Sequence, residues 1–122
     1  MRVALIGLAT AMVLGHVPQS VMAEETPSDA QLAMIKTSLG KYMPGAETKD
    51  IVFSHQSGDP GKRTFVVCGF GETADQRLPF HAMIVEDGEA TNASVTTYGF
   101  NDRFKSMVYE ECAAKGAALR GE

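Results

Sequence analysis

The stretch TFVVCGF, residues 64–70, decides the fold, because it is rich in β-prone residues and apolar on both faces. Side chains two residues apart in a strand share a face, so Val66 and Cys68 point to one side. Phe65 and Val67 point to the other side. A strand that is apolar on both faces is typical of the covered centre of a sheet. We therefore expect a central strand here with one layer packed on each face.

Three further segments have strand patterns. They are residues 50–56 (DIVFSHQ), 80–86 (FHAMIVE) and 90–98 (ATNASVTTY). The turn cluster SGDPG at residues 57–61 follows the first of them, and Asp87-Gly88 is a hairpin signal between the last two. Links this short indicate antiparallel pairing.

A helix is predicted before the strands. Its apolar stripe recurs at helical spacing and contains Leu32, Ile35, Leu39 and Tyr42. Thr26 or Ser28 can cap its N-terminus, Pro27 fits a first helical position, and Pro44-Gly45 stops it.

A second helix is predicted after the strands. Asn101 caps it, and Gly116 ends it. The residues that fall on one side of this helix are Phe104, Met107, Val108, Cys112 and Ala113.

The order α-β-β-β-β-α predicts a single α+β domain over residues 24–122, with an antiparallel four-stranded sheet and one helix at each end of the chain. A chain of 122 residues with 44% hydrophobic residues has room for one core. We expect the first helix to cover Phe65 and Val67. The alternative is that this face is exposed and binds a partner.

The first 23 residues have the pattern of a signal peptide. Arg2 supplies the positive charge, residues 3–15 form an uncharged apolar run, and residues 21–23 (VMA) fit a cleavage site. The apolar run is shorter than the roughly 20 residues of a membrane span, and no cysteine adjoins the cleavage site for a lipid anchor. We expect cleavage after Ala23 and a periplasmic or secreted bacterial protein without a membrane anchor.

Both cysteines, Cys68 and Cys112, lie in the predicted mature chain. Two cysteines in a small exported domain most often pair, so we expect one disulfide. The bridge would clamp the last helix onto the face that Val66 shares with Cys68. A catalytic thiol and two buried free thiols are the alternatives, but nothing near either cysteine suggests the base that a nucleophile needs.

Two arrangements could carry chemistry. His55 and His81 could act together in acid–base hydrolysis if the fold brings them close. His81 and Met83 share a strand face and combine two soft ligands of the kind that suit Cu(I). The simpler interpretation is that the histidines are unrelated and Met83 fills the core, so we expect no cofactor.

The net charge of −4 argues against nucleic acid as a partner. Since the candidate catalytic and metal-binding pairs are also weak, the sequence favours a non-enzymatic binding or envelope accessory module. The partner is expected to be a protein or an envelope component. Periplasmic copper binding through His81 and Met83 is one alternative function, and a small secreted hydrolase using His55 and His81 is another.

The chain resembles a group of small exported bacterial proteins of uncharacterised function. The resemblance is carried by Val67-Cys68-Gly69 in a strand, by Leu78-Pro79-Phe80 after a polar stretch, by the bend at Pro44-Gly45-Ala46, and by a second cysteine near the C-terminus, Cys112. It implies export and a disulfide, and it implies no particular activity.

Overall fold

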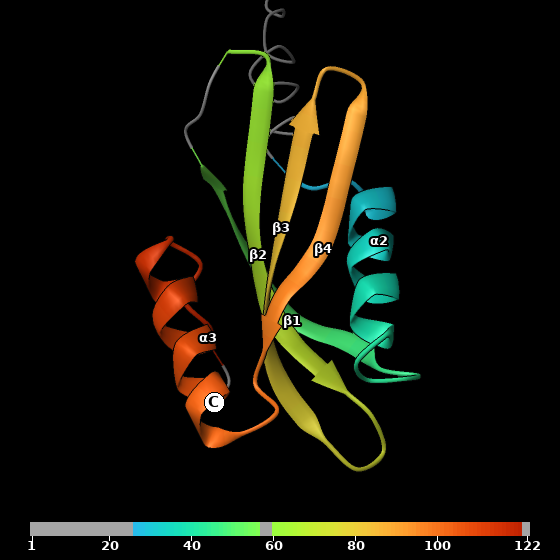
Figure 1. Ribbon diagram of the computed structural model, residues 1–122, viewed down its shortest axis with the longest axis vertical. Helices are drawn as coiled ribbons and strands as arrows, with labels where there is room; N and C mark the ends of the chain where they lie inside the picture. Colours follow the sequence, from blue (N-terminus) through green and yellow to red (C-terminus); the bar gives the residue numbers. More distant parts are fainter. Residues whose placement is uncertain (1–25, 57–59, 121–122) are drawn as a thin grey trace, which may run out of the picture.

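A computed structural model describes residues 26–56 and 60–120, so the predicted signal peptide and its cleavage site lie outside the described residues. The elements are, in chain order, α2 (Asp29–Gly40), β1 (Glu47–Gln56), β2 (Lys62–Glu72), β3 (Arg77–Asp87), β4 (Ala90–Tyr98) and α3 (Asp102–Ala114). The predicted α+β class is confirmed. Figure 1 looks onto the edge of the sheet that β4 forms, with α2 on one side of the sheet and α3 on the other.

The four strands form one antiparallel sheet in the order β1-β2-β3-β4. The central position predicted for residues 64–70 is confirmed, because β2 pairs with β1 on one side and with β3 on the other. The β2–β3 ladder is continuous, whereas the register shifts once in each outer pair. In β1 the shift lies between Lys49 and Val52, where Asp50 has a φ of 52°.

Helix α2 begins at a capping box, in which Ser28 accepts a hydrogen bond from the backbone N–H of Gln31 and the Gln31 side chain accepts one from the backbone of Ser28. Ser28 is therefore the N-cap, and Pro27 precedes the cap instead of opening the helix. The predicted place of Tyr42 in the apolar stripe is wrong, because the helix ends at Gly40. Tyr42 is 51% exposed, and Met43 is buried in its place.

The face of the sheet that α2 covers is called the α2 face. Its core contains eleven buried residues, Ile35, Leu39, Met43, Ala46, Phe65, Val67, Phe80, Ala82, Ile84, Ala93 and Val95. Phe65 and Val67 are both 0% exposed, so the expected cover by the first helix is confirmed. The alternative assignment of these two residues to a binding surface is wrong, since neither side chain reaches the surface. The helix packs so closely that a Cβ on Gly71 would lie 2.7 Å from Leu39 Cδ2.

The opposite face is called the α3 face. Asn101 caps α3 by accepting a hydrogen bond from the N–H of Phe104, and Gly116 follows the helix with a φ of 84°, as predicted. The core here is small and contains five buried residues, Val66, Cys68, Val108, Cys112 and Ala117. The predicted apolar side of the helix is too wide, because Met107 is 42% exposed and Ala113 is also exposed.

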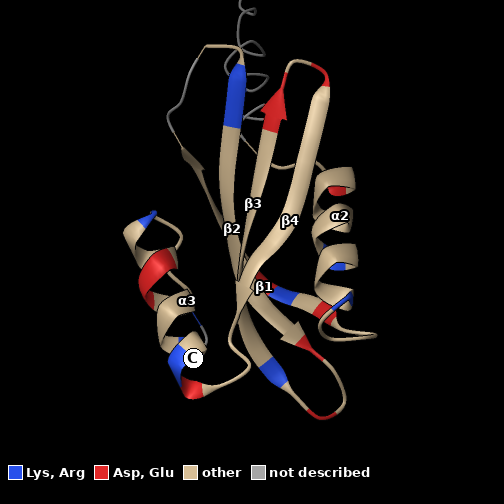
Figure 2. Ribbon diagram, viewed as in Figure 1, with Lys and Arg blue, Asp and Glu red and all other residues tan. Residues whose placement is uncertain are grey.

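Charged side chains lie mainly toward the strand ends and on the helices, while β4 carries none (Figure 2). Within the described part of the chain, neither helix is long and apolar enough to cross a membrane.

Candidate functional site

The predicted disulfide between Cys68 of β2 and Cys112 of α3 is present, with an S–S distance of 2.02 Å. Both residues are 0% exposed. The bridge joins the central strand to the last helix, as the sequence pattern suggested. Neither cysteine is free, so neither can act as a nucleophilic thiol while the bond is intact.

The two histidines lie on opposite faces of the sheet. His55 pairs with Phe65, and its ring lies 5.3 Å from the Phe65 ring on the α2 face. His81 pairs with Cys68 on the α3 face. Since the sheet separates the two imidazoles, they do not meet, and the histidine pair postulated for hydrolysis is not formed.

His81 contacts the side chain of Thr96. The Thr96 hydroxyl oxygen lies 3.1 Å from the backbone carbonyl oxygen of His81 and 2.5 Å from its Nδ1. The other ring nitrogen, Nε2, is buried without a hydrogen-bond partner among the described residues. Burial lowers the pKa of His81, although Glu111 acts in the opposite direction. The imidazole is accordingly neutral at pH 7.

Met83 lies two residues after His81 in β3 and so shares its face, partly buried opposite Val66 of β2. Among the described residues, no group of three or more His, Cys, Asp or Glu side chains could hold a metal ion. The copper alternative therefore depends on His81 and Met83 alone, and it stays a prediction.

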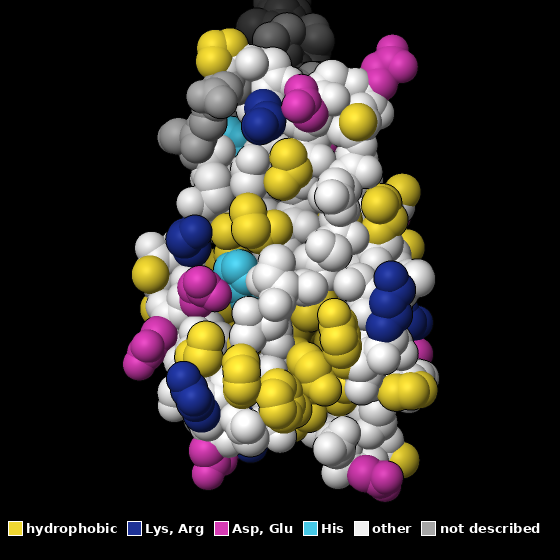
Figure 3. All heavy atoms as spheres, viewed as in Figure 1, with side chains coloured by type: hydrophobic (Ala, Val, Ile, Leu, Met, Phe, Trp, Pro, Cys, Tyr) yellow, Lys and Arg dark blue, Asp and Glu magenta, His cyan; other side chains and the backbone are white. Residues whose placement is uncertain are grey.

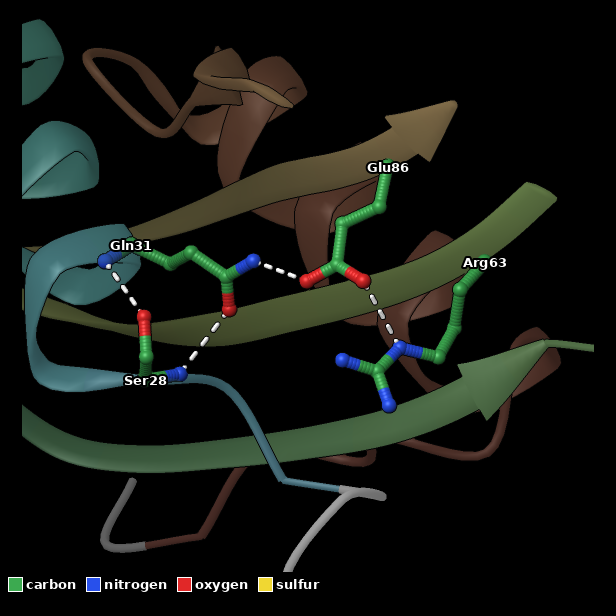
Figure 4. Close-up of polar contacts among 4 residues, drawn as sticks. All are labelled: Ser28, Gln31, Arg63 and Glu86. Carbon is green, nitrogen blue, oxygen red and sulfur yellow. Dashed lines mark hydrogen bonds and ion pairs between the residues drawn. The ribbon is translucent and has the colours of Figure 1, made fainter. Parts of the chain in front are cut away.

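A chain of polar contacts links the start of α2 to β2 and β3 (Figure 4). The Gln31 amide donates to one carboxylate oxygen of Glu86. The Arg63 guanidinium donates to the other oxygen at 2.8 Å. Arg63 also lies over the Phe65 ring, 5.2 Å from its centroid.

This network holds Glu86 as an ionised carboxylate. The hydrogen bond from Arg63 lowers the pKa of Glu86 most, and the hydrogen bond from Gln31 and the charge of Arg63 lower it further. Both carboxylate oxygens already accept hydrogen bonds. The contacts of Glu86 therefore attach the start of α2 to the sheet. A general acid or base would need an oxygen turned toward a substrate.

A run of aromatic rings lies at the end of the β4 edge. Tyr42 stacks on Tyr98 with ring centroids 5.1 Å apart, and Phe100 stacks on Phe104 at 4.6 Å. Tyr98 and Phe100 join the two pairs at 5.2 Å. We call these four residues the aromatic surface. Figure 3 shows hydrophobic side chains gathered at the lower end of this edge, between the two helices.

The aromatic surface is both exposed and uncharged. Tyr42 is 51% and Phe100 is 53% exposed. A hollow of about 190 Å³ lies beside the rings and is also lined by Val95, Thr96 and Thr97. No charged side chain lines it, so the hollow suits an apolar or hydroxyl-bearing group.

The sequence pattern does not predict this surface. It places Tyr42 in the apolar stripe of the first predicted helix and Phe104 on the apolar side of the second, and it indicates no role for Phe100. A usable signal was present, because Tyr98 and Phe100 flank the glycine that leads from β4 toward α3. Aromatic residues at such a link are either exposed or packed over the end of the sheet.

No protein-family model matches this chain, and neither the curated proteins nor the solved structures include a significant match to it.

Proposed function

We propose that this protein is a non-enzymatic binding module of the bacterial cell envelope, and that it contacts its partner through the aromatic surface. The observation that carries the proposal is the half-exposure of Tyr42 and Phe100 within two stacked pairs of rings that a tilted contact joins. Leaving two large rings in water forgoes the free energy of burying them, which a partner can recover. Aromatic residues are enriched at protein interfaces and among the residues that dominate binding energy.

The chemistry of the surface restricts the partner. Its rings and its threonines are uncharged, so the partner presents an uncharged patch with apolar groups and hydrogen-bonding groups. An acidic protein of net charge −4 also selects against polyanions. A neutral polymer or a neutral protein surface fits these requirements.

The placement of the candidate catalytic groups supports binding over hydrolysis. His55 and His81 are separated by the sheet, and Glu86 is committed to Arg63 and Gln31. None of the three lines the hollow beside the aromatic rings.

Export is part of the proposal. The buried disulfide supports it, because disulfides persist in oxidising compartments such as the periplasm. We predict that protein recovered from the envelope begins at Glu24. An N-terminal sequence that includes Arg2 would contradict the proposed cleavage.

The binding role is tested by photo-crosslinking in living cells. A photoreactive benzoylphenylalanine replaces Phe100, and a matched variant carries it at Met107, which is 42% exposed on α3 outside the aromatic surface. We expect a discrete adduct from position 100 that is absent from position 107. Adding Tyr42→Ala should abolish the adduct while the protein stays folded. The same adducts from both positions, or none from position 100, would overturn the proposal.

Copper binding is a second candidate, favoured by the buried, unpartnered Nε2 of His81 on the face of Met83. Calorimetric titration of the oxidised protein with Cu(I) tests it. Heat that disappears in Met83→Ala would support the site, whereas no heat, or the same heat in the variant, would end it.

A further inference from the structure

Three basic residues adjoin the aromatic surface along the chain. Lys41 directly precedes Tyr42 after the end of α2. Arg103 and Lys105 flank Phe104 at the start of α3. We call these three basic residues the basic rim. Figure 3 shows Lys or Arg side chains on both sides of the hydrophobic group at the lower end of the β4 edge. The run of rings therefore has positive charge at both of its ends.

The cations of the basic rim have no ion-pair partner among the described residues. The ion pairs in that part of the chain use Lys36, Arg63 and Arg77 as their cations. Asp102 is the acidic neighbour of Arg103 in the sequence, and it offsets one of the three positive charges beside the rings. The protein as a whole has a net charge of −4. The basic rim is therefore a local exception to the charge of the chain, and it adjoins the exposed rings.

Lys105 is held against the link between Tyr98 and Phe100. That link is Gly99, whose N–H donates to the carbonyl oxygen of Pro79 at 2.8 Å. A Cβ on Gly99 would lie 2.7 Å from Lys105 Cγ and 2.9 Å from Pro79 Cγ, so the link is packed closely between β3 and α3. This packing fixes the stem of Lys105, and a lysine held by its stem keeps its ammonium in water. The rings and this cation therefore form a surface that needs little ordering when a partner binds.

We propose that the partner of the aromatic surface is a protein whose contact patch has an apolar side chain at its centre and carboxylates around it. This inference rests on the proposed function and names the chemistry of the partner. The apolar side chain would enter the uncharged hollow of about 190 Å³ beside the rings. The carboxylates would lie opposite Lys41, Arg103 and Lys105, an arrangement that fixes the orientation of the partner and speeds its association.

Charge favours a compact acidic patch on a protein over the other envelope components. A neutral polymer would gain nothing from the unpaired cations of the basic rim. An anionic membrane presents a continuous plane of charge, which a protein of net charge −4 opposes. At physiological ionic strength the Debye length is about 8 Å, so a partner that meets only this surface interacts chiefly with the cations beside it. A protein patch of limited size is the partner that these charges select.

Charge reversal combined with photo-crosslinking from position 100 tests the inference. Lys41→Glu and Arg103→Glu together reverse two exposed cations of the basic rim. Carboxylates would then face carboxylates, so the yield of the adduct should fall at least about tenfold. Lys49→Glu and Lys62→Glu together make the same change in net charge on β1 and β2, and they should leave the yield unchanged. In an envelope extract, raising the salt from about 0.05 M to about 0.5 M should also lower the yield, because salt screens exposed charges.

The outcomes separate this inference from the proposed function. A protein adduct that survives reversal of the basic rim, or that falls equally in the control, overturns the acidic partner and leaves the binding role standing. An adduct of lipid or polysaccharide, identified by mass spectrometry, has the same consequence. No adduct from position 100 with the native basic rim overturns the proposed function and this inference with it. The supporting result is a protein adduct that depends on the basic rim and on salt, and whose cross-linked peptide carries Asp or Glu beside an apolar residue.

Discussion

The two faces of the sheet are covered by different means. On the α2 face, eleven buried residues pack around a helix that has no covalent tie to the sheet. On the α3 face, five buried residues suffice, and two of them are the bonded cysteines. A helix that buries so little apolar surface gains little free energy from packing alone, and a disulfide offsets this by restricting the unfolded chain. The comparison shows that a small domain can be packed on one side and clamped on the other.

The faces also differ in their titratable side chains. The α2 face carries an ionised carboxylate, Glu86, that Arg63 and Gln31 satisfy. The α3 face carries a neutral imidazole, His81, with one unsatisfied nitrogen. Protonation of either side chain at falling pH lowers the stability of the folded protein, and the two side chains protonate in different pH ranges.

Removing the clamp should have the largest effect. The double substitution Cys68→Ala and Cys112→Ala opens a cross-link between residues 44 apart in sequence. We expect the free energy of unfolding to fall by about 4 kcal/mol. Urea denaturation measures the loss, and hydrogen exchange should show amides of α3 losing protection before those of α2. Equal loss of protection in both helices would contradict the difference between the faces.

A cavity in the packed face should rank second. Leu39 is a residue of α2 that is 0% exposed, and Leu39→Ala should cost about 3 kcal/mol. Met34→Ala on the same helix changes a side chain that is 40% exposed and serves as the control. It should shift the free energy of unfolding by less than about 0.5 kcal/mol. Similar losses in the two variants would show that α2 does not hold its face by packing.

Breaking the network on the α2 face should have a smaller effect. Glu86→Gln removes the charge that Arg63 and Gln31 contact, and we expect a loss of about 1 kcal/mol at pH 7, since the group is partly exposed. The folded-state pKa of Glu86 is lowered, so its contribution is present above the unfolded value near 4.5 and is lost as the pH falls through the folded pKa. The variant should therefore show a shallower loss of stability below about pH 4.5. An unchanged acid profile would contradict the assignment.

The titration of His81 should give the smallest effect, on the α3 face. Its folded-state pKa is lowered, so the unfolded chain takes up a proton first as the pH falls below about 6.5. Stability is full above that pH and is lost progressively below it until the folded imidazole is also protonated. Stability measured from pH 7.5 to 5 should therefore fall in the wild type and fall less in His81→Gln. Parallel curves for the two proteins would refute a buried neutral imidazole.

Local pattern was sufficient to predict the layers. Strand β2 is apolar on both faces, and this pattern correctly predicts its central position. The alternation of side chains along β2 correctly predicts that Cys68 lies on the face that contacts Cys112. These features depend on strand periodicity and on a few turn residues, which short-range sequence shows directly.

The aromatic surface required tertiary information. Helix α2 ends at Gly40, because glycine is a poor helix former. Tyr42 lies beyond this end, so its helical spacing from Leu39 does not place it on the apolar stripe of the helix. It meets Tyr98, 56 positions later, only because α2 packs beside the end of β4. The contact between Gln31 and Glu86 likewise joins residues 55 apart. No periodicity along one element indicates such pairs.

The architecture depends most on the covalent tie between α3 and β2, and counting thiols tests that tie directly. Protein purified from the cell envelope is unfolded without reductant and treated with a thiol-blocking reagent. We predict that neither Cys68 nor Cys112 reacts before reductant is added and that both react afterwards. Two blocked thiols per chain before reduction would contradict the clamp and, with it, the proposed compartment.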